Sequence, residues 1–449
     1  MRPEALSGRR VSLLGFGREG RALEAALAAL SIDADVHVWS ESRPDREPAA
    51  WPLTVGPLDA RIAEADLVLR SPGVPDRHSA LQACRRAGVP VTGPSSLWFG
   101  ARPDQPCIAV TGSKGKSTTT MLVAELLRAA GNSVEVAGNI GRPLVGLLDA
   151  DADWFVVELS SYQLVDLQGR PSVGVITRLF PEHADWHGSE QAYYDAKLRL
   201  VDLLEGRPLW INGGDARLAD AVRGVEGLNL ANLPDDLHGR NDGLWRGEKR
   251  LLSAEDWPLA GRHNLDNLAL AWSVVESVTD EAGAARFVAA ARAFRALPHR
   301  LEEVPGPSGR RYVNDSIATT PYATRAALET CRGPVVLIAG GQPRDADWTP
   351  VVEVAGRHRL RGLVTLPDNG PAVARFLVDR GAVGGERVRA AGGIEEAVEL
   401  ADAMAGPGAT ILLSPGAPSF PHFRDFEERG RRFRDAVGRL ASGPESRAD

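Results

Sequence analysis

Lys116 lies in a stretch whose residue types suit the binding of a polyphosphate. The sequence Cys107–Thr120 reads CIAVTGSKGKSTTT, an apolar β-branched run followed by a glycine-rich turn and the start of a helix. Backbone N–H groups at such a turn, together with the positive end of the helix dipole, form an anion site. Lys116 would place its charge on the terminal phosphates, and the hydroxyl of Ser117 or Thr118 would complete the coordination shell of a magnesium ion.

The spacing of this turn departs from the usual phosphate-loop pattern, because Val110 stands where the first glycine would be. Plain turn chemistry is the alternative interpretation. A strand, two glycines, Lys-Ser-Thr and a helix in that order favour phosphate binding instead, so ATP or GTP is the expected cofactor. The predicted nucleotide-binding loop consists of Gly112, Ser113, Lys114, Gly115, Lys116, Ser117 and Thr118.

Glu158 ends a later apolar run, where a carboxylate beside a phosphate loop is placed to hold magnesium. The loop after the next predicted strand, Val173–Thr177, carries His183, Asp185 and His187. Surface loops often carry such residues without function, and a role is favoured here because the loop should share a sheet edge with Glu158. Transition-metal binding by the two histidines is the alternative, but oxygen ligands beside a phosphate loop favour magnesium.

The first hundred residues alternate between strand and helix patterns. Arg10–Leu14 is a predicted strand, Gly15–Gly20 a turn of the form GxGxxG, and Arg21–Leu30 a helix. Nucleotide binding and tight strand-to-helix packing explain this motif equally well. A further strand at Ala65–Leu69 leads to Ser71–Gly73, either a ligand-binding turn or a simple one.

Two predicted helices carry polar residues that a structural explanation also fits. Lys197 lies in the middle of the helix Glu190–Leu204, and a lysine on an amphipathic helix is ordinarily solvated. Asn264 and Asn267 begin an alanine-rich helix and share one face of it, where they could hydrogen-bond a base. Capping of this helix by Asn264 is the simpler explanation.

The last third repeats the α/β pattern. Arg311–Asn314, Val335–Ile338 and Ala409–Leu413 are predicted strands, and the third runs into Ser414–Phe420 before a charged helix that begins near Phe426. Strand ends rich in Ser, Asp, Gly and Arg indicate a polar ligand here.

Length and composition limit the alternatives. A chain of 449 residues should form about three domains. The net charge of -7 argues against nucleic acid as the main partner, and three scattered cysteines are too few for a disulfide framework or a cysteine metal site. The N-terminus is a poor secretory signal, and no run of about 20 apolar residues occurs, so we expect a cytoplasmic protein without a membrane partner.

Six motifs occur in one order along nearly the whole chain: TGSKGKSTTT, GNIG, ELSSYQ, GRHN, LPHR and NDS. This ordered set resembles the Mur ligases, ATP-dependent enzymes that form amide bonds in peptidoglycan precursors. The resemblance implies an α/β fold of three domains. These are a Rossmann-like domain for the UDP-substrate (1–100), a central P-loop ATPase-like domain (101–297) and a Rossmann-like domain for glutamate and nucleotide (298–449).

The resemblance also implies residue roles. Lys116, His183 and Lys197 would be catalytic, with Lys197 carbamylated so that it becomes a metal ligand. Beyond the loop, the implied nucleotide contacts are Asn264, Asn267, Arg300 and Asp315, and the implied magnesium ligands are Thr118, Glu158, His183 and Lys197. The implied substrate contacts are Gly15, Phe16, Gly17, Arg18, Ser71, Pro72, Gly73, Asn139 and Ser161 for the UDP-N-acetylmuramoyl part, and Arg344, Ser419 and Phe426 for glutamate.

Within the family, the PHRLE, VNDS and LLSPGAPSF motifs are most similar to enzymes that add glutamate to UDP-N-acetylmuramoyl-L-alanine. D-glutamate-adding members commonly carry a lysine where this chain has Ile317, and isoleucine cannot pair with a carboxylate. The motif set is most similar to the subgroup that adds L-glutamate, whose product a separate epimerase inverts, and a monomer is expected. Addition of D-glutamate, a ligase for another amino acid, a nicotinamide oxidoreductase and a noncatalytic UDP-sugar-binding protein are the alternatives.

Overall fold

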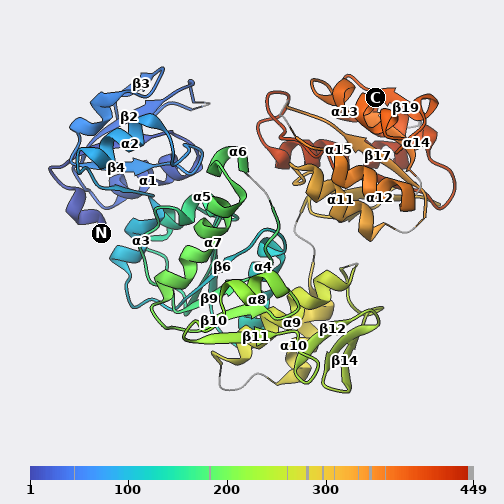
Figure 1. Cartoon of the computed structure of the whole chain (residues 1–449), viewed down its shortest axis with the longest axis horizontal. Helices are drawn as coiled ribbons and strands as arrows, with labels where there is room; N and C mark the ends of the chain where they lie inside the picture. Colours follow the sequence, from blue (N-terminus) through green and yellow to red (C-terminus); the bar gives the residue numbers. More distant parts are fainter. Residues whose placement is uncertain are drawn as a thin grey trace. The chain divides into compact units, whose positions relative to one another are not determined.

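The computed structural model describes the chain except for residues 45, 182–183, 260, 280–282, 296–297, 308, 332, 343–345, 359 and 443–449. It divides into two compact units, Met1–Phe294 and Arg295–Asp449, and both consist of β-sheets with helices packed against them (Figure 1). The predicted α/β class is confirmed. Within the described residues, no helix combines the length and apolarity needed to cross a bilayer. Cys84, Cys107 and Cys331 are buried and free.

The first sheet is parallel and has the order β3-β2-β1-β4-β5. Its strands are β1 (Arg10–Leu14), β2 (Asp35–Ser40), β3 (Leu53–Val55), β4 (Leu67–Arg70) and β5 (Val91–Thr92). The helices of this part are η1 (Pro3–Leu6), α1 (Arg18–Ala29), η2 (Ala60–Glu64), α2 (Ser79–Arg86) and α3 (Ser95–Ala101). The helix α1 begins three residues earlier than predicted, so Gly20 lies inside its first turn, where its Cα packs close to the Phe16 ring. The strands β3 and β5 were missed because each is too short to show a pattern.

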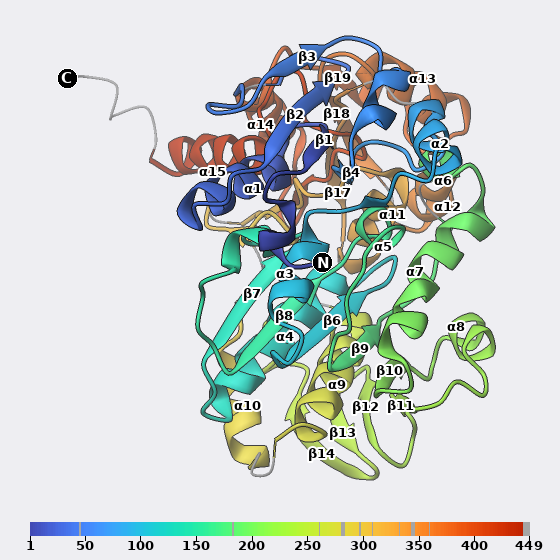
Figure 2. The ribbon, with the colours of Figure 1, turned by 90° about the vertical axis from the view of Figure 1, so that its left-hand side faces the viewer.

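The second sheet is parallel with the order β11-β10-β9-β6-β8-β7, which can be followed in Figure 2. Its strands are β6 (Cys107–Thr111), β7 (Val134–Gly138), β8 (Trp154–Glu158), β9 (Val173–Ile176), β10 (Leu209–Asn212) and β11 (Leu228–Ala231). The helices are α4 (Lys116–Ala129), η3 (Leu144–Leu147), α5 (Ser161–Leu164), α6 (Ala184–His187), α7 (Glu190–Leu204), α8 (Ala216–Ala221), α9 (Arg262–Glu276) and α10 (Ala284–Ala293). Hydrophobic clusters bury both faces, which explains why these strands read as continuous apolar runs.

A small antiparallel sheet of β12 (Leu237–Arg240), β13 (Gly243–Arg246) and β14 (Lys249–Ser253) was not predicted. Two-residue connections join its strands, one of them the Asn-Asp pair that precedes Gly243. Such a two-residue connection is typical of a β-hairpin, which the sequence-based prediction did not include. Leu237, Leu244 and Leu252 pack this sheet into the hydrophobic core that contains α9.

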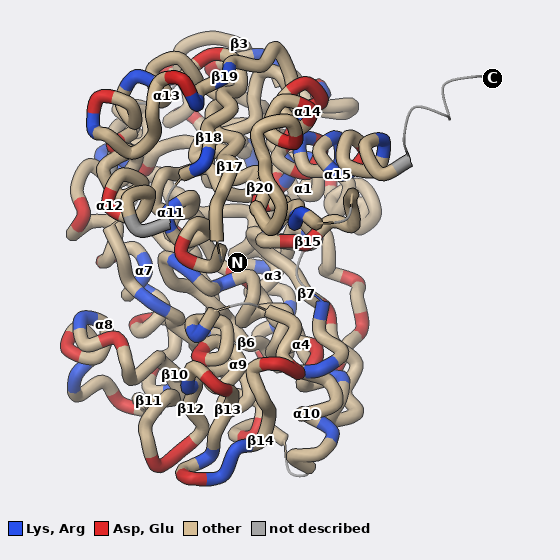
Figure 3. Tube along the Cα trace, turned by 90° about the vertical axis from the view of Figure 1, so that its right-hand side faces the viewer, with Lys and Arg blue, Asp and Glu red and all other residues tan. Residues whose placement is uncertain are grey.

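The second unit holds one mixed sheet with the order β15-β16-β20-β17-β18-β19, in which only the β15–β16 pair is antiparallel. Its strands are β15 (Glu302–Val304), β16 (Arg311–Asn314), β17 (Val335–Ala339), β18 (Leu360–Thr365), β19 (Val388–Ala390) and β20 (Thr410–Leu413). The helices are α11 (Pro321–Thr330), α12 (Thr349–His358), α13 (Gly370–Asp379), η4 (Gly385–Arg387), α14 (Ile394–Met404) and α15 (Phe426–Ser442). Acidic and basic residues interleave along the chain in the view of Figure 3.

Candidate active site

The glycine-rich loop predicted to bind phosphate connects β6 to α4, as the sequence indicated. Gly112 and Gly115 have φ of +137° and +89°, conformations that residues with a side chain rarely adopt, and Gly115 is the N-cap of α4. The Lys116 amine folds over the loop and donates to the carbonyl oxygens of Gly112 (2.8 Å) and Ser113 (3.1 Å). Because α4 begins at Lys116, its first N–H groups and its dipole face the same loop.

Residues that the sequence did not single out brace this loop from β9 and α7. Thr177 Oγ1 donates to the carbonyl of Lys114 (2.6 Å), and the Ser113 N–H donates to the carbonyl of Arg178 (2.6 Å). The Tyr193 hydroxyl donates to Ser113 Oγ (2.8 Å). The loop is therefore held in one conformation by its neighbours, which suits a binding site that must be preorganised.

Lys197 is only 1% exposed, although its helical pattern predicted a solvated side chain. Its Nζ donates to the carbonyl of Gly112 (2.7 Å) and lies 4.8 Å from the centre of the Tyr193 ring. One signal could have revealed it, because lysine occurs only four times among 52 basic residues. Three of the four are Lys114, Lys116 and Lys197. In a chain that uses arginine almost everywhere, these positions favour a compact amine.

Glu158 ends β8 and is 1% exposed. Its Oε1 accepts a hydrogen bond from Asn139 Nδ2 (2.7 Å), whereas its buried Oε2 has no partner among the described residues. An unpaired buried carboxylate oxygen beside a phosphate loop fits a magnesium ligand. The described residues contain no group of three His, Cys, Asp or Glu that could hold a metal. Proteins often bind Mg²⁺ through one or two carboxylates plus phosphate oxygens and water. His183 lies outside the described residues.

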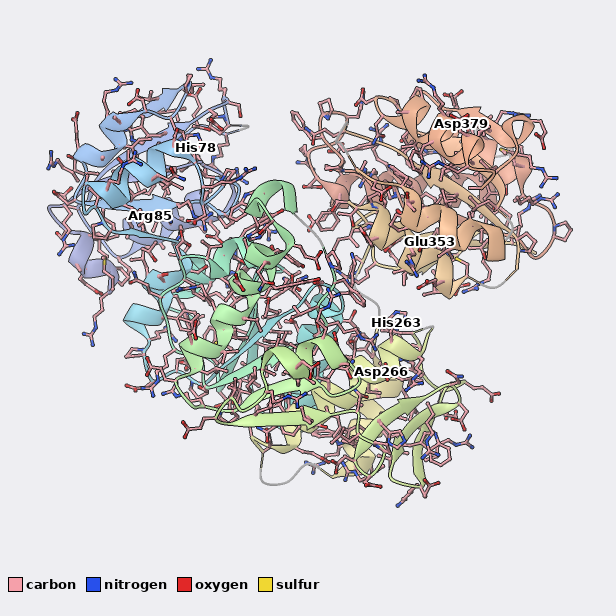
Figure 4. All side chains as sticks on the ribbon, viewed as in Figure 1. His78, Arg85, His263, Asp266, Glu353 and Asp379 are labelled. Carbon is pink, nitrogen blue, oxygen red and sulfur yellow. The ribbon has the colours of Figure 1, made fainter. Side chains whose placement is uncertain are left out.

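The helix α9 carries the two predicted asparagines, and both are buried. Asn267 lies against the phosphate loop, since a Cβ added at Gly115 would come within 2.7 Å of its Oδ1. The suggestion that Asn264 caps this helix is wrong, because Gly261 is the N-cap and no side chain forms the capping bond. Asp266, labelled in Figure 4, binds the guanidinium of Arg178 at 2.6 Å and so ties α9 to the loop after β9.

A pocket of about 410 Å³ lies between the first and second sheets. The predicted substrate residues among its lining are Gly15, Gly17, Arg18, Ser71, Pro72, Gly73 and Asn139. Ser71 Oγ donates to the carbonyl of Gly15 (2.9 Å) and joins the two turns. Phe16 and Ser161 do not line the pocket, because Phe16 packs into the hydrophobic core and Ser161 is buried with its Oγ 3.0 Å from His187 Nε2.

The pocket also contains residues that sequence reasoning missed. Trp39, Ser40, Glu41 and Ser42 come from the end of β2, and the rule that an acidic residue about 20 positions after the glycines contacts a ribose could have found Glu41. The lining further includes Glu19, Leu58, Val74, Gly138, Pro143 and Gln163. Gln163 Nε2 donates to Glu19 Oε1 (2.6 Å), and burial is the main cause that raises the pKa of Glu19 to about 7.

In the second unit, polar groups gather at the carboxyl ends of β16 and β20. Asp315 accepts from the Leu301 N–H (3.3 Å), next to Arg300, and from Ser414 Oγ (2.9 Å). Arg429 is fully buried and donates to Ser316 Oγ (3.0 Å), Ser316 O (2.8 Å) and Ala417 O (3.1 Å). Burial lowers the pKa of Arg429 to about 9.

Ser316 also donates to the carbonyl of Phe426 (2.8 Å), so Arg429 and Ser316 together fix the start of α15. Ser419 is buried in the turn after β20, and its carbonyl accepts from the Phe423 N–H (3.2 Å). Arg344, the third residue expected at the glutamate site, lies outside the described residues.

Comparisons with known proteins agree with this geometry. Residues 110–275 match the Mur ligase middle domain, and residues 299–416 match the glutamate ligase domain of Mur ligases. The chain is 38% identical to UDP-N-acetylmuramoyl-L-alanine--L-glutamate ligase of Xanthomonas oryzae (98% of this chain, 97% of the relative) and 39% identical to that of a Micromonospora species (99% and 100%). A MurF ligase from Thermotoga maritima in complex with ADP has a similar fold, with a TM-score of 0.58 and 13% identity over 98% of this chain and 97% of that one. The chain therefore belongs to the Mur ligase family, whose members are ATP-dependent, ADP-forming amide ligases.

Proposed function

We propose that this chain joins L-glutamate to UDP-N-acetylmuramoyl-L-alanine and cleaves ATP to ADP and phosphate. The observation that carries this proposal is the near full-length match, at 38% and 39% identity, to two ligases named for that reaction. Residues 1–100 would hold the UDP part of the substrate, 101–297 would hold ATP, and 298–449 would supply glutamate and part of the nucleotide site.

The nucleotide would bind along the glycine-rich loop. Its phosphates would accept hydrogen bonds from the loop N–H groups and from Lys116, whose amine already lies over the loop. Asn267 packs against Gly115 and is placed to contact the nucleotide. Magnesium would be held by Thr118 and Glu158, with His183 and carbamylated Lys197 as further ligands, and when bound it supplies positive charge to the phosphate oxygens.

The UDP-linked substrate would lie in the pocket of about 410 Å³. Its diphosphate suits the N-terminus of α1 beside Gly15 and Gly17, and its ribose suits the end of β2 near Glu41. Asn139 belongs to this pocket and also donates to Glu158. A substrate that extends past Asn139 would therefore bring its terminal carboxylate toward the phosphate loop.

The reaction would proceed in two steps. A carboxylate oxygen of the alanyl residue attacks the γ-phosphorus, the bond to the β-phosphate oxygen breaks, and ADP leaves from an acyl phosphate. The glutamate amine then attacks the acyl carbon, loses its proton, and expels inorganic phosphate. Lys116 would stabilise the negative charge on the transferred phosphoryl group.

We assign L-glutamate rather than D-glutamate because Ile317 replaces the lysine common in D-specific members, so the pocket must bind the side-chain carboxylate by other groups. Arg344, Ser419 and Phe426 are the proposed contacts. The product would carry an L-glutamyl residue, and a separate epimerase would act on it afterwards.

We also expect a monomer, because the large apolar side chains exposed in the described part of the chain are scattered over separate elements: Leu30, Val55, Phe180, Tyr322 and Phe420. The consumption of ATP favours the cytoplasm as the place of reaction.

Phosphate release by the purified protein with ATP, magnesium and UDP-N-acetylmuramoyl-L-alanine tests the proposal, with L-glutamate and D-glutamate in parallel reactions. Turnover with L-glutamate alone is the expected result. Turnover with D-glutamate alone would overturn the assignment of chirality. Binding of the UDP-sugar without phosphate release from either reaction would indicate a noncatalytic binding protein.

A further inference from the structure

Glu19 is a buried carboxyl group in the substrate pocket. Its residue is 9% exposed, it lines the pocket, and its Oε1 accepts from the neutral side-chain amide of Gln163 at 2.6 Å. Carboxyl groups of this kind are normally paired with a cation or exposed to water. The proposed reaction assigns no role to Glu19, and the burial of this carboxyl group in the substrate pocket is left to explain.

The charged groups around Glu19 are engaged elsewhere. From β4, Arg70 donates to both carboxylate oxygens of Asp166, at 2.6 and 3.0 Å. From α1 itself, Arg18 donates to the carbonyl of Gly141 in the loop before η3. Glu41, across the pocket, has a side chain that is 61% exposed and lies 3.4 Å from the ring of His78, which Figure 4 labels.

Glu19 also stands where an anion should bind. It is the second residue of α1, whose N-cap is Gly17, and no side chain caps this helix. The first N–H groups of α1 and its dipole therefore favour a phosphate at this end of the pocket. An ionised carboxylate about 4 Å away would repel that phosphate and weaken binding by roughly 5- to 1000-fold, depending on the local dielectric. A neutral carboxylic acid would instead offer a hydrogen-bond donor.

We propose that Glu19 binds the substrate diphosphate as a neutral carboxylic acid, which donates its O–H to a phosphate oxygen, so that substrate binding takes up one proton from solution. The proposal rests on the proposed function, which supplies the diphosphate. The raised pKa of Glu19, about 7, supports it, because the acid form is then accessible near neutral pH. Burial and the like charge of Asp166 oppose ionisation of Glu19, whereas the hydrogen bond from Gln163 and the charges of Arg70 and Arg18 favour it.

The test measures the Kd of UDP-N-acetylmuramoyl-L-alanine by calorimetry at about pH 6 and about pH 8.5. The ligand's diphosphate diester and carboxylate keep their charge over this range, so a change in Kd reports the protein. If only the acid form of Glu19 binds, the wild-type Kd rises roughly 30-fold between the two values. Glu19→Gln keeps an oxygen that accepts from Gln163 and an amide that donates to phosphate, so its Kd stays constant with pH. At about pH 8.5 the Kd of this variant is lower than that of the wild type. Glu41→Gln, in the same pocket, keeps the wild-type slope.

A second measurement needs no variant. Calorimetry of the wild type near pH 8 in buffers of different ionisation enthalpy counts protons, and uptake of about one proton per substrate is expected. A Kd that falls as pH rises, or binding with neither a pH slope nor proton uptake, would overturn the role of Glu19. Absence of binding by wild type and variant alike would instead overturn the proposed function.

Discussion

Gly112→Ala is a substitution for which the structure predicts a strong local effect on the phosphate loop. A Cβ at this position would lie 2.1 Å from Thr177 Oγ1 and 3.1 Å from both the N and the O of Arg178. The φ of +137° is also unfavourable for alanine. Both effects act on the loop that is proposed to hold the phosphates of ATP.

The size of the effect follows from these two terms. Holding alanine at such a φ costs about 1–3 kcal/mol. Displacing Thr177 breaks its bonds to the carbonyls of Thr111 (3.2 Å) and Lys114 (2.6 Å), at about 1 kcal/mol each. The combined cost is about 4 kcal/mol. If the loop changes conformation to avoid this cost of about 4 kcal/mol, the affinity for ATP falls by about 10³-fold.

The assay is the Kd of ATP by calorimetry, together with the melting temperature. Gly131→Ala is the matched control, since Gly131 follows α4 with φ of +96° and has no atom within 4 Å of an added Cβ. It should lower the melting temperature without changing the Kd. Thr177→Ala should lower the melting temperature less in the Gly112→Ala background than in the wild type, because it also removes the hydroxyl that clashes with the added Cβ. An ATP affinity of Gly112→Ala within about threefold of the wild type would refute the assignment of this loop.

Three further outcomes are expected. Burial raises the pKa of Glu19 from its usual 4.5 to about 7, so its contribution to stability is complete below pH 4.5 and is lost as pH rises through 7. Glu19→Gln should therefore raise the melting temperature more at about pH 8 than at pH 5, and the gain in the free energy of unfolding has an upper limit of about 3 kcal/mol. Equal shifts at both pH values would contradict this. Arg70→Met leaves the buried carboxylate of Asp166 unpaired and should lower the free energy of unfolding by about 3–5 kcal/mol in chemical denaturation. Arg61→Met, which removes an exposed ion pair with Asp59, should have a much smaller effect in the same assay, and equal losses would contradict this. Lys114→Arg should lower kcat/KM for ATP by at least about tenfold, because the larger planar guanidinium replaces a compact amine in the loop. Lys249→Arg on β14 should change kcat/KM by less than about twofold. Equal effects of the two substitutions in steady-state kinetics would remove any special role for Lys114.

The sequence alone determined elements whose local pattern is strong. β1, β16 and α7 occupy the predicted residues, since a mostly buried strand shows mostly apolar residues after its charged first residue and a long helix shows its period. The phosphate loop was predictable for a similar reason. Its glycines, lysine and hydroxyl residues are adjacent in the chain, so local chemistry suffices to identify them.

Only the tertiary structure decided what depends on distant segments. Lys197 reads as a surface residue on its own helix, and it becomes buried because α7 packs beside the loop that carries Gly112. Glu19 is one residue of the predicted turn Gly15–Gly20, and only the fold brings Gln163, 144 residues away, into hydrogen-bond contact with it. Burial and charge environment are sums over neighbours in space, and a one-dimensional pattern records only neighbours along the chain.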